Sequence, residues 1–130
     1  MLIYGHRFIE SEPFYHVLNI DSISNTPPAS TIFVEFSEAN LDIINHLRAN
    51  SIIFALSIKN ITQIIYASSL DASFIMVPKE LTSTAQNLAN NYLFDAKILV
   101  NIESEDEIEE LAILGVDCVV FANAIIKINS

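Results

Sequence analysis

From Thr31 onward, short apolar runs alternate with segments of helical period along the chain. The runs are rich in β-branched residues, and apolar positions fill them continuously, which is typical of strands buried on both faces. Five such runs are present: TIFVEF (31–36), IIFALSI (52–58), SFIMVP (73–78), KILVNI (97–102) and DCVVFA (117–122). Strands that are joined by helices run parallel, because a helical crossover returns the chain to the same end of the sheet.

The segments between these runs carry helix signals. Apolar residues of 38–49 and 79–93 recur at helical spacing, and they predict buried faces that include Leu41, Ile44, Leu47, Leu81, Ala85, Leu88, Ala89 and Tyr92. Ser37 is an expected cap of the first helix. Asn60 with Gln63, and Ser104 with Glu107, have the spacing of capping boxes. Gly115 stands where a left-handed helix end is expected.

Residues 58–77 align without gaps on residues 102–121, as two units of strand end, cap, helix, tight turn and strand. Residues 1–30 differ, since they offer two short strand candidates, MLIYGHRFI and FYHVLNI, and a turn at NTPPAS. The sequence therefore predicts one α/β domain over 1–130, with an irregular part at 1–30 and repeating β-α units over 31–130. The expected architecture is a three-layer Rossmann-like open sheet, mostly parallel, with five to six strands and helices on both faces.

Charge and cysteine content narrow the classes of partner. Six Lys and Arg residues stand among sixteen acidic residues, for a net charge of −10. This balance argues against nucleic acid and anionic membrane surfaces as partners. No apolar stretch reaches the length of a membrane span, so direct membrane insertion is not expected. The single cysteine, Cys118, lies in an apolar run, which predicts a buried, inert thiol and favours a cytoplasmic location.

Candidate binding residues stand where the expected strands end, because ligands of parallel α/β sheets lie beyond the carboxyl ends of the strands. Gly5, His6 and Arg7 could cradle an anion, or they could form an ordinary turn with a solvated arginine. Glu35 has the place of a ribose-binding acid, and its alternative is a polar strand end. Ser57 and Lys79 follow two further strands, and polar neighbours favour an exposed Lys79. Spacing supports neither catalytic residues nor a metal site.

The order of strands and helices resembles a known family. TIFVE, SEANLDIINHLRAN, SIIFALS, LDASFIMV, TAQNLANNYLF, AKILVNI, ESEDEIEEL and LGVDCVVF follow one another as they do in the N-terminal Rossmann-type domain of the RCK family, the regulators of potassium conductance. The resemblance covers about 90 residues, and most of its motifs determine the fold. It implies an adenine nucleotide as ligand, pairing of two copies, and a membrane transport protein as partner.

The chain departs from that family where nucleotide binding is decided. The family has GxGxxG between its first strand and first helix, whereas this chain has YGHRF and no helix soon after it. Ser57 stands where the family's third strand ends in Gly-Asp. Only Glu35 matches a binding position, that of the ribose-binding acid. The short βα units also resemble part of a (β/α)₈ phosphate-binding barrel, which five units cannot close, so a half-barrel is an alternative.

Three functions follow as expectations. The first is a non-catalytic regulatory or ligand-binding module that resembles a degenerate RCK nucleotide domain and is linked to ion transport. The second is a structural protein that forms homodimers and binds no small ligand. The third is an enzyme that acts on a small phosphorylated substrate, with Gly5, His6 and Arg7 and either Lys59 or Lys79 converging at one sheet edge. The absence of an evident acid–base pair favours a non-enzymatic role.

Overall fold

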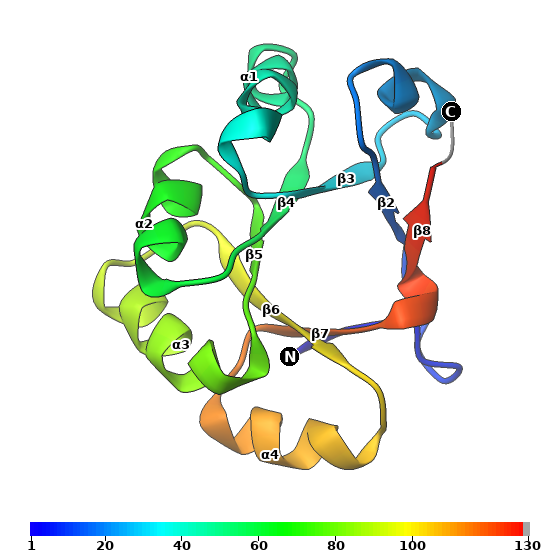
Figure 1. The fold of residues 1–130 in the computed structure, drawn as a ribbon. Coiled ribbons are helices and arrows are strands. Elements are labelled where there is room, and N and C mark those ends of the chain that lie inside the picture. Colours follow the sequence, from blue (N-terminus) through cyan, green and yellow to red (C-terminus); the bar gives the residue numbers. More distant parts are fainter. Residues whose placement is uncertain (129–130) are drawn as a thin grey trace.

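A computed structural model describes residues 1–128 of the chain (Figure 1). Its strands are β1 (Leu2–Tyr4), β2 (Phe14–His16), β3 (Thr31–Glu35), β4 (Phe54–Ser57), β5 (Phe74–Met76), β6 (Lys97–Ile102), β7 (Cys118–Phe121) and β8 (Ile125–Lys127). Its α-helices are α1 (Leu41–Ala49), α2 (Ile61–Ser69), α3 (Thr82–Asn91) and α4 (Asp106–Leu114). Short 3₁₀ helices are η1 (Asp21–Asn25), η2 (Glu38–Asn40), η3 (Lys79–Leu81) and η4 (Ala122–Ala124).

All strands belong to one sheet, in the order β1-β7-β6-β5-β4-β3-β2-β8, and every neighbouring pair is parallel. The predicted α/β class and parallel sheet are therefore confirmed. The five predicted runs correspond to β3 through β7, and β1 and β2 lie within the two N-terminal candidates. The sheet has eight strands where five to six were predicted, because both N-terminal candidates form strands, β1 and β2, and a short segment that was not predicted forms β8 one turn of 3₁₀ helix after β7.

The sheet is curled into a ring, as Figure 1 shows. β1 and β8 are the two end strands of the hydrogen-bonded order. In the chain, β1 is followed by β2, which lies next to β8, and β8 is preceded by β7, which lies next to β1. We call β1–β2 and β7–β8 the two interrupted strands. Because β1 pairs with β7 and β2 pairs with β8, these interrupted strands lie side by side and complete the ring. The N-terminal segment thus supplies β1 and β2, the strands that five βα units lack for closing a ring.

Aromatic contacts across the interior confirm the curl. The Phe14 ring of β2 lies 5.3 Å from the Phe74 ring of β5 and 4.9 Å from the Tyr4 ring of β1, measured between ring centroids. These strands are not neighbours in the sheet. A ring of this size is narrow enough for side chains to fill it. The inner core also contains Phe33, Ala55, Leu99, Cys118, Val120 and Ala124.

A second, larger core lies between the outer face of the ring and the helices. Alternate residues of each strand point into it, such as Val34, Leu56, Ile75 and Val100. The helices contribute Ile44, Leu47, Ile64, Ala85 and Leu111. In Figure 1, α1 to α4 all lie outside the ring, where the prediction had helices on both faces of an open sheet. The continuous apolar runs arise because each strand is buried on one side by helices and on the other by opposite strands.

All four helices in the described residues end in the same way, with a residue of left-handed backbone conformation. These residues are Ser51, Asp71, Leu93 and Gly115, whose φ angles lie between 53° and 81°. After each, a backbone N–H bonds a carbonyl of the last helical turn, for example Ala72 to Ala67 and Val116 to Leu111. Gly115 is confirmed as a left-handed helix end, and the aligned repeat places Asp71 at the equivalent position.

Leu93 has a φ of 53°, which is unfavourable for a residue with a Cβ. Its side chain is 84% exposed, so burial does little to offset this strain. We expect Leu93→Gly to stabilise the protein by about 0.5–1 kcal/mol, because relief of left-handed strain exceeds the entropy that glycine adds to the unfolded chain. Urea denaturation followed by circular dichroism measures the change. The control is Leu93→Ala, which keeps the strain and should give no gain, so equal effects of the two variants contradict the explanation.

Four further predictions about the helices had different outcomes. The Asn60 side chain accepts a bond from the Gln63 N–H at 3.0 Å, which confirms the cap of α2. Ser37 makes no side-chain capping bond, because the 3₁₀ helix η2 precedes α1. Tyr92, predicted on a buried face, is 70% exposed, since α3 ends at Asn91 and the chain turns away there. Leu41, also predicted on a buried face, is 37% exposed at the first turn of α1.

Candidate functional site

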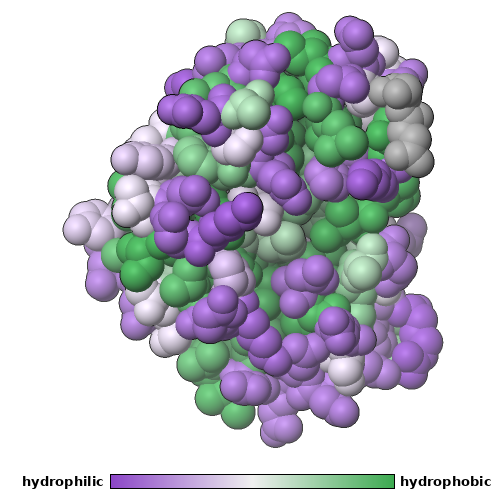
Figure 2. All heavy atoms as spheres, viewed as in Figure 1, coloured by the Kyte–Doolittle hydropathy of each residue, from purple (hydrophilic) through white to green (hydrophobic). Residues whose placement is uncertain are grey.

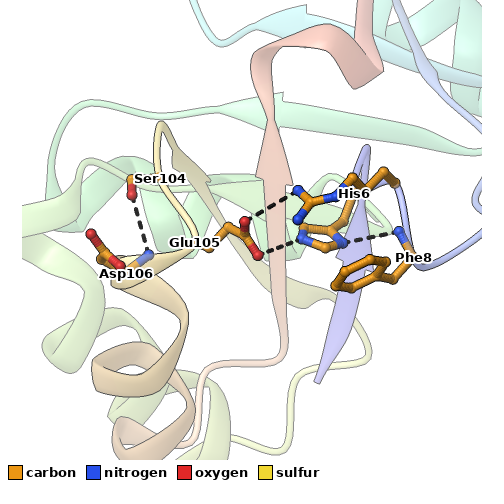
Figure 3. Close-up of polar contacts among 6 residues, drawn as sticks. His6, Phe8, Ser104, Glu105 and Asp106 are labelled. Atoms are coloured by element: carbon orange, nitrogen blue, oxygen red, sulfur yellow. Dashed lines mark hydrogen bonds and ion pairs between the residues drawn. The ribbon is translucent and has the colours of Figure 1, made fainter.

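His6 and Arg7, two of the residues predicted to bind an anion, are occupied by a carboxylate of the protein itself. They follow β1, and both side chains point toward Glu105, which directly precedes α4 (Figure 3). The His6 Nε2 lies 2.9 Å from Glu105 Oε2, and the Arg7 Nη1 lies 3.2 Å from Glu105 Oε1. We call these three residues the outer cluster. Its anion-binding groups are thus already paired.

The hydrogen bonds fix the tautomer of His6. Its Nδ1 accepts a bond from the Phe8 N–H at 3.1 Å, so Nε2 carries the proton that is donated to Glu105. Bonds from His6, and secondarily from Arg7, hold the pKa of Glu105 below its usual value. The His6 side chain is only 7% exposed, whereas Arg7 and Glu105 face solvent. This arrangement fastens the loop after β1 to the start of α4.

Lys79, another predicted site residue, is also paired at the start of α4. Its Nζ lies 2.6 Å from Glu107 Oε1, while Glu107 Oε2 accepts bonds from the backbone N–H groups of Glu103 and Ser104. The bond from Lys79, followed by the two backbone bonds, lowers the pKa of Glu107 to about 2. The predicted capping box of Ser104 and Glu107 is confirmed only in its acid half, because the Ser104 Oγ accepts a bond from the Asp106 N–H and not from Glu107; Glu107 binds Lys79 as well. Arg7 and Lys79 both bind acids at the start of α4, but each has its own partner, Glu105 or Glu107.

Gly5 has a structural role where the β1–β2 connection meets the β7–β8 connection, a place that we call the seam of the ring. Its φ is 89°, and a Cβ placed on it would lie 2.9 Å from the Cβ of Ala124 in η4. Its carbonyl accepts a bond from Asn123, and its N–H donates to Ser11 Oγ. The backbone of Gly5 is thus used to bring the β1–β2 connection against the β7–β8 connection. An open hollow of about 540 Å³ lies beside it, between residues 5–11 and Asn123.

A second set of polar side chains lies at the carboxyl ends of the strands, on the inward-facing positions of the ring. Each follows an inward residue of the inner core by two positions, and strand alternation therefore places it on the same face: Phe14 precedes His16, Phe33 precedes Glu35, Ala55 precedes Ser57, Leu99 precedes Asn101 and Ile125 precedes Lys127. We call His16, Glu35, Ser57, Asn101 and Lys127 the mouth group.

Register brings members of the mouth group next to one another. His16 is the pairing partner of Lys127 on β8, and Glu35 is the partner of Ser57 on β4. The His16 ring packs edge-on against Phe33, with centroids 5.0 Å apart. Burial lowers the pKa of His16, while the charge of Glu35 opposes this shift and the charge of Lys127 adds to it. Both charged residues therefore act on the same imidazole.

The two sets of residues differ in whether their polar atoms are satisfied. Every charged side chain of the outer cluster has an ionic partner within the protein. Within residues 1–128, by contrast, the side chains of the mouth group make no hydrogen bond or ion pair with one another or with the rest of the protein. Of these two sets, the mouth group is therefore the one whose hydrogen-bonding capacity is available to a ligand.

Of the six residues predicted to bind a ligand, the structure brings Gly5, His6 and Arg7 together on one loop, and it makes Glu35 and Ser57 neighbours. Lys79 joins neither set. Sequence reasoning missed His16 and Lys127. Their signal was an inward position two residues after an apolar one, but β2 and β8 are only three residues long, too short for alternation to be recognised.

Other chemistry finds little support in the part of the chain described. Cys118 is buried in the inner core, and burial raises the pKa of its thiol to about 12, which keeps it protonated. Residues 1–128 hold no group of three or more His, Cys, Asp or Glu side chains placed to bind a metal ion. Among their helices, none has the length and apolar character needed to cross a bilayer.

Comparison with known proteins adds no family to these observations. A scan against protein-family models gave no match to the chain, and a search of curated proteins likewise gave none. The mouth group, defined by its position in the ring and its unpaired polar atoms, is therefore the basis on which a function is proposed.

Proposed function

We propose that the chain is a non-catalytic ligand-binding module whose ligand, a small polar molecule, lies at the carboxyl-end mouth of the ring. The observation that carries this proposal is the gathering of unpaired polar side chains, His16, Glu35, Ser57, Asn101 and Lys127, on inward positions at that end. Ligands of parallel α/β sheets are bound beyond the carboxyl ends of the strands. The apolar inner core lies below this end of the ring, and its residue Phe33 packs beside His16, its pairing partner.

The order of the strands favours a ligand site at the mouth of the ring rather than in a crevice between two strands. In an open Rossmann sheet, the ligand lies where the order of the strands reverses. Here β2 to β7 follow one another around the ring in chain order, without a reversal. The nucleotide and the role in ion transport implied by the RCK resemblance stay predictions, and so does a cytoplasmic location.

Ligand binding is tested with a panel of adenine nucleotides, sugar phosphates, short carboxylic acids and α-amino acids, monitored by ¹H–¹⁵N NMR. We expect a member of the panel to shift the amide resonances at the ends of β2, β3, β4 and β8, and Glu35→Gln to weaken its binding at least about tenfold. Glu35 is exposed, so the variant should fold normally.

Arg7→Met is the matched control, because it removes a charge from the outer cluster and leaves the mouth intact. Binding that is lost in Arg7→Met and kept in Glu35→Gln would place the site at the outer cluster and contradict the proposal. A panel that shifts no resonance at the mouth would contradict it as well.

Self-association is a second candidate function, favoured by apolar side chains that face solvent. Leu93 is 84% exposed, Ile113 79% and Tyr92 70%, and all three lie at the C-terminal ends of α3 and α4. Figure 2 shows hydrophobic residues interspersed with hydrophilic ones on one face of the molecule. Sedimentation at micromolar concentration should reveal a dimer if these side chains are covered, and a monomer alone would remove this candidate.

A further inference from the structure

We propose that the ligand of the mouth is a small zwitterion of the α-amino acid class, with its carboxylate bound at Lys127 and its ammonium bound at Glu35. This inference rests on the proposed function and specifies its ligand. It follows from the placement of one cation and one anion, both unpaired, on the two sides of His16.

The register sets the distance between the two charges. Lys127 pairs with His16 on β2, and His16 pairs with Phe33 on β3, two residues before Glu35. With about 4.8 Å between strands and about 3.3 Å per residue, the Cα atoms of Lys127 and Glu35 lie roughly 12 Å apart. Both residues belong to the inward face, and both are near enough to His16 for their charges to act on its imidazole. A molecule whose opposite charges are a few ångströms apart fits between their ends.

The two charged side chains at the mouth differ from the side chains of the chain that form ion pairs. Arg7, Arg48 and Lys79 each pair with an acid within 4 Å, namely Glu105, Asp71 and Glu107. Lys127 and Glu35 form no such pair in the described residues, although both act on the pKa of His16. Because His16 stands between them, each charge keeps its own site free for a partner from outside.

Simpler ligands leave one charge without a partner. An anion bound at Lys127 would be repelled by Glu35 and by the net charge of −10, whereas a cation bound at Glu35 would be repelled by Lys127. A zwitterion satisfies both groups and leaves the net charge of the site unchanged. His16 adds little charge of its own near neutral pH, because burial lowers its pKa and its two charged neighbours act in opposite directions.

Ser57 and Asn101 complete the site with neutral polar groups. Ser57 is the pairing partner of Glu35, so its hydroxyl lies on the side where the ammonium is expected. Asn101 comes from β6, across the ring from β2 and β3, and can contact the variable part of the ligand. In the proposed site, Lys127 and Glu35 thus bind the carboxylate and the ammonium of the ligand. The side chain of the ligand faces the opposite side of the ring, where Asn101 lies.

The experiment compares an α-amino acid with its two halves. The intact protein is titrated with the common α-amino acids, and with acetate, methylammonium and inorganic phosphate, while amide resonances of His16, Glu35, Ser57 and Lys127 are followed by NMR. We expect at least one amino acid to bind at least about tenfold tighter than acetate or methylammonium. Glu35→Gln and Lys127→Met should each remove most of that preference, and Arg7→Met should keep it.

The outcomes separate this inference from the proposed function. Acetate or phosphate that binds at the mouth as tightly as every amino acid would overturn the zwitterion and leave a ligand site in place. The same holds if a nucleotide or sugar phosphate shifts the mouth resonances and no amino acid does. If no compound of either panel shifts them, the inference and the proposed function both fail.

Discussion

Replacing Phe14 with alanine is expected to lower the free energy of unfolding by about 3–5 kcal/mol, the usual cost of deleting a buried phenyl ring. Phe14 is 1% exposed, and its ring contacts those of Tyr4 and Phe74 from strands elsewhere in the ring. The loss removes both apolar burial and the contact between the interrupted strand β1–β2 and the opposite wall. Guanidinium denaturation, followed by circular dichroism and by tyrosine fluorescence, measures the change.

Phe8→Ala is the matched control for this prediction. Phe8 is 75% exposed on the loop between β1 and β2, where its main contacts are the Arg7 guanidinium and the His6 ring. Its replacement should cost less than about 1 kcal/mol. Similar losses in the two variants would show that the interior of the ring is not the tightly packed core described here.

Gly5→Ala is expected to destabilise the protein by about 2–4 kcal/mol, through left-handed strain together with overpacking. The φ of Gly5 is 89°, and an added Cβ would come within 2.9 Å of the Ala124 Cβ. The methyl group would push η4 away from β1 and open the seam of the ring. Thermal and urea denaturation measure the loss, and hydrogen exchange should show it first in β1 and β8.

Gly115→Ala separates the two causes of that loss. Gly115 has a similar φ of 81°, but a Cβ there would meet no atom within 4 Å. Only the backbone strain then applies, and we expect a cost of about 1 kcal/mol. If both glycines prove equally sensitive, close approach at the seam contributes nothing.

The regular part of the fold could be predicted because its signals are local. A continuous apolar strand such as Thr31–Glu35, a helix of clear period and a cap such as Asn60 are each determined by neighbouring residues. The curl could not be predicted in this way. It depends on β8, a three-residue strand, and on contacts such as Phe14 with Phe74 that join distant parts of the chain.

The candidate site was predictable in position but not in composition. Reading the carboxyl ends of the strands found Glu35 and Ser57, which belong to the mouth group. The same rule selected Arg7 and Lys79, but each forms an ion pair with an acid at the start of α4, Glu105 or Glu107, that stands far away in the sequence. Partners of this kind become visible only once the fold brings them together. A structural network was missed for the same reason: Gln86 on α3 exchanges hydrogen bonds with Asp117, which also accepts from the Ile98 N–H.

The side-by-side arrangement of the two interrupted strands has a consequence for biosynthesis. Leu2 of β1 pairs with Cys118 of β7, so β1 must wait for a strand that is made much later, whereas β2 can pair early with β3 and only its other edge waits for β8. β3 to β6 can associate earlier, because each is joined to its neighbour by one helix. The nascent chain therefore holds β1 without its partner until the segment that forms β7 has been made. Such late, long-range pairing slows folding and lengthens the time in which an unpaired strand can engage a chaperone or another chain.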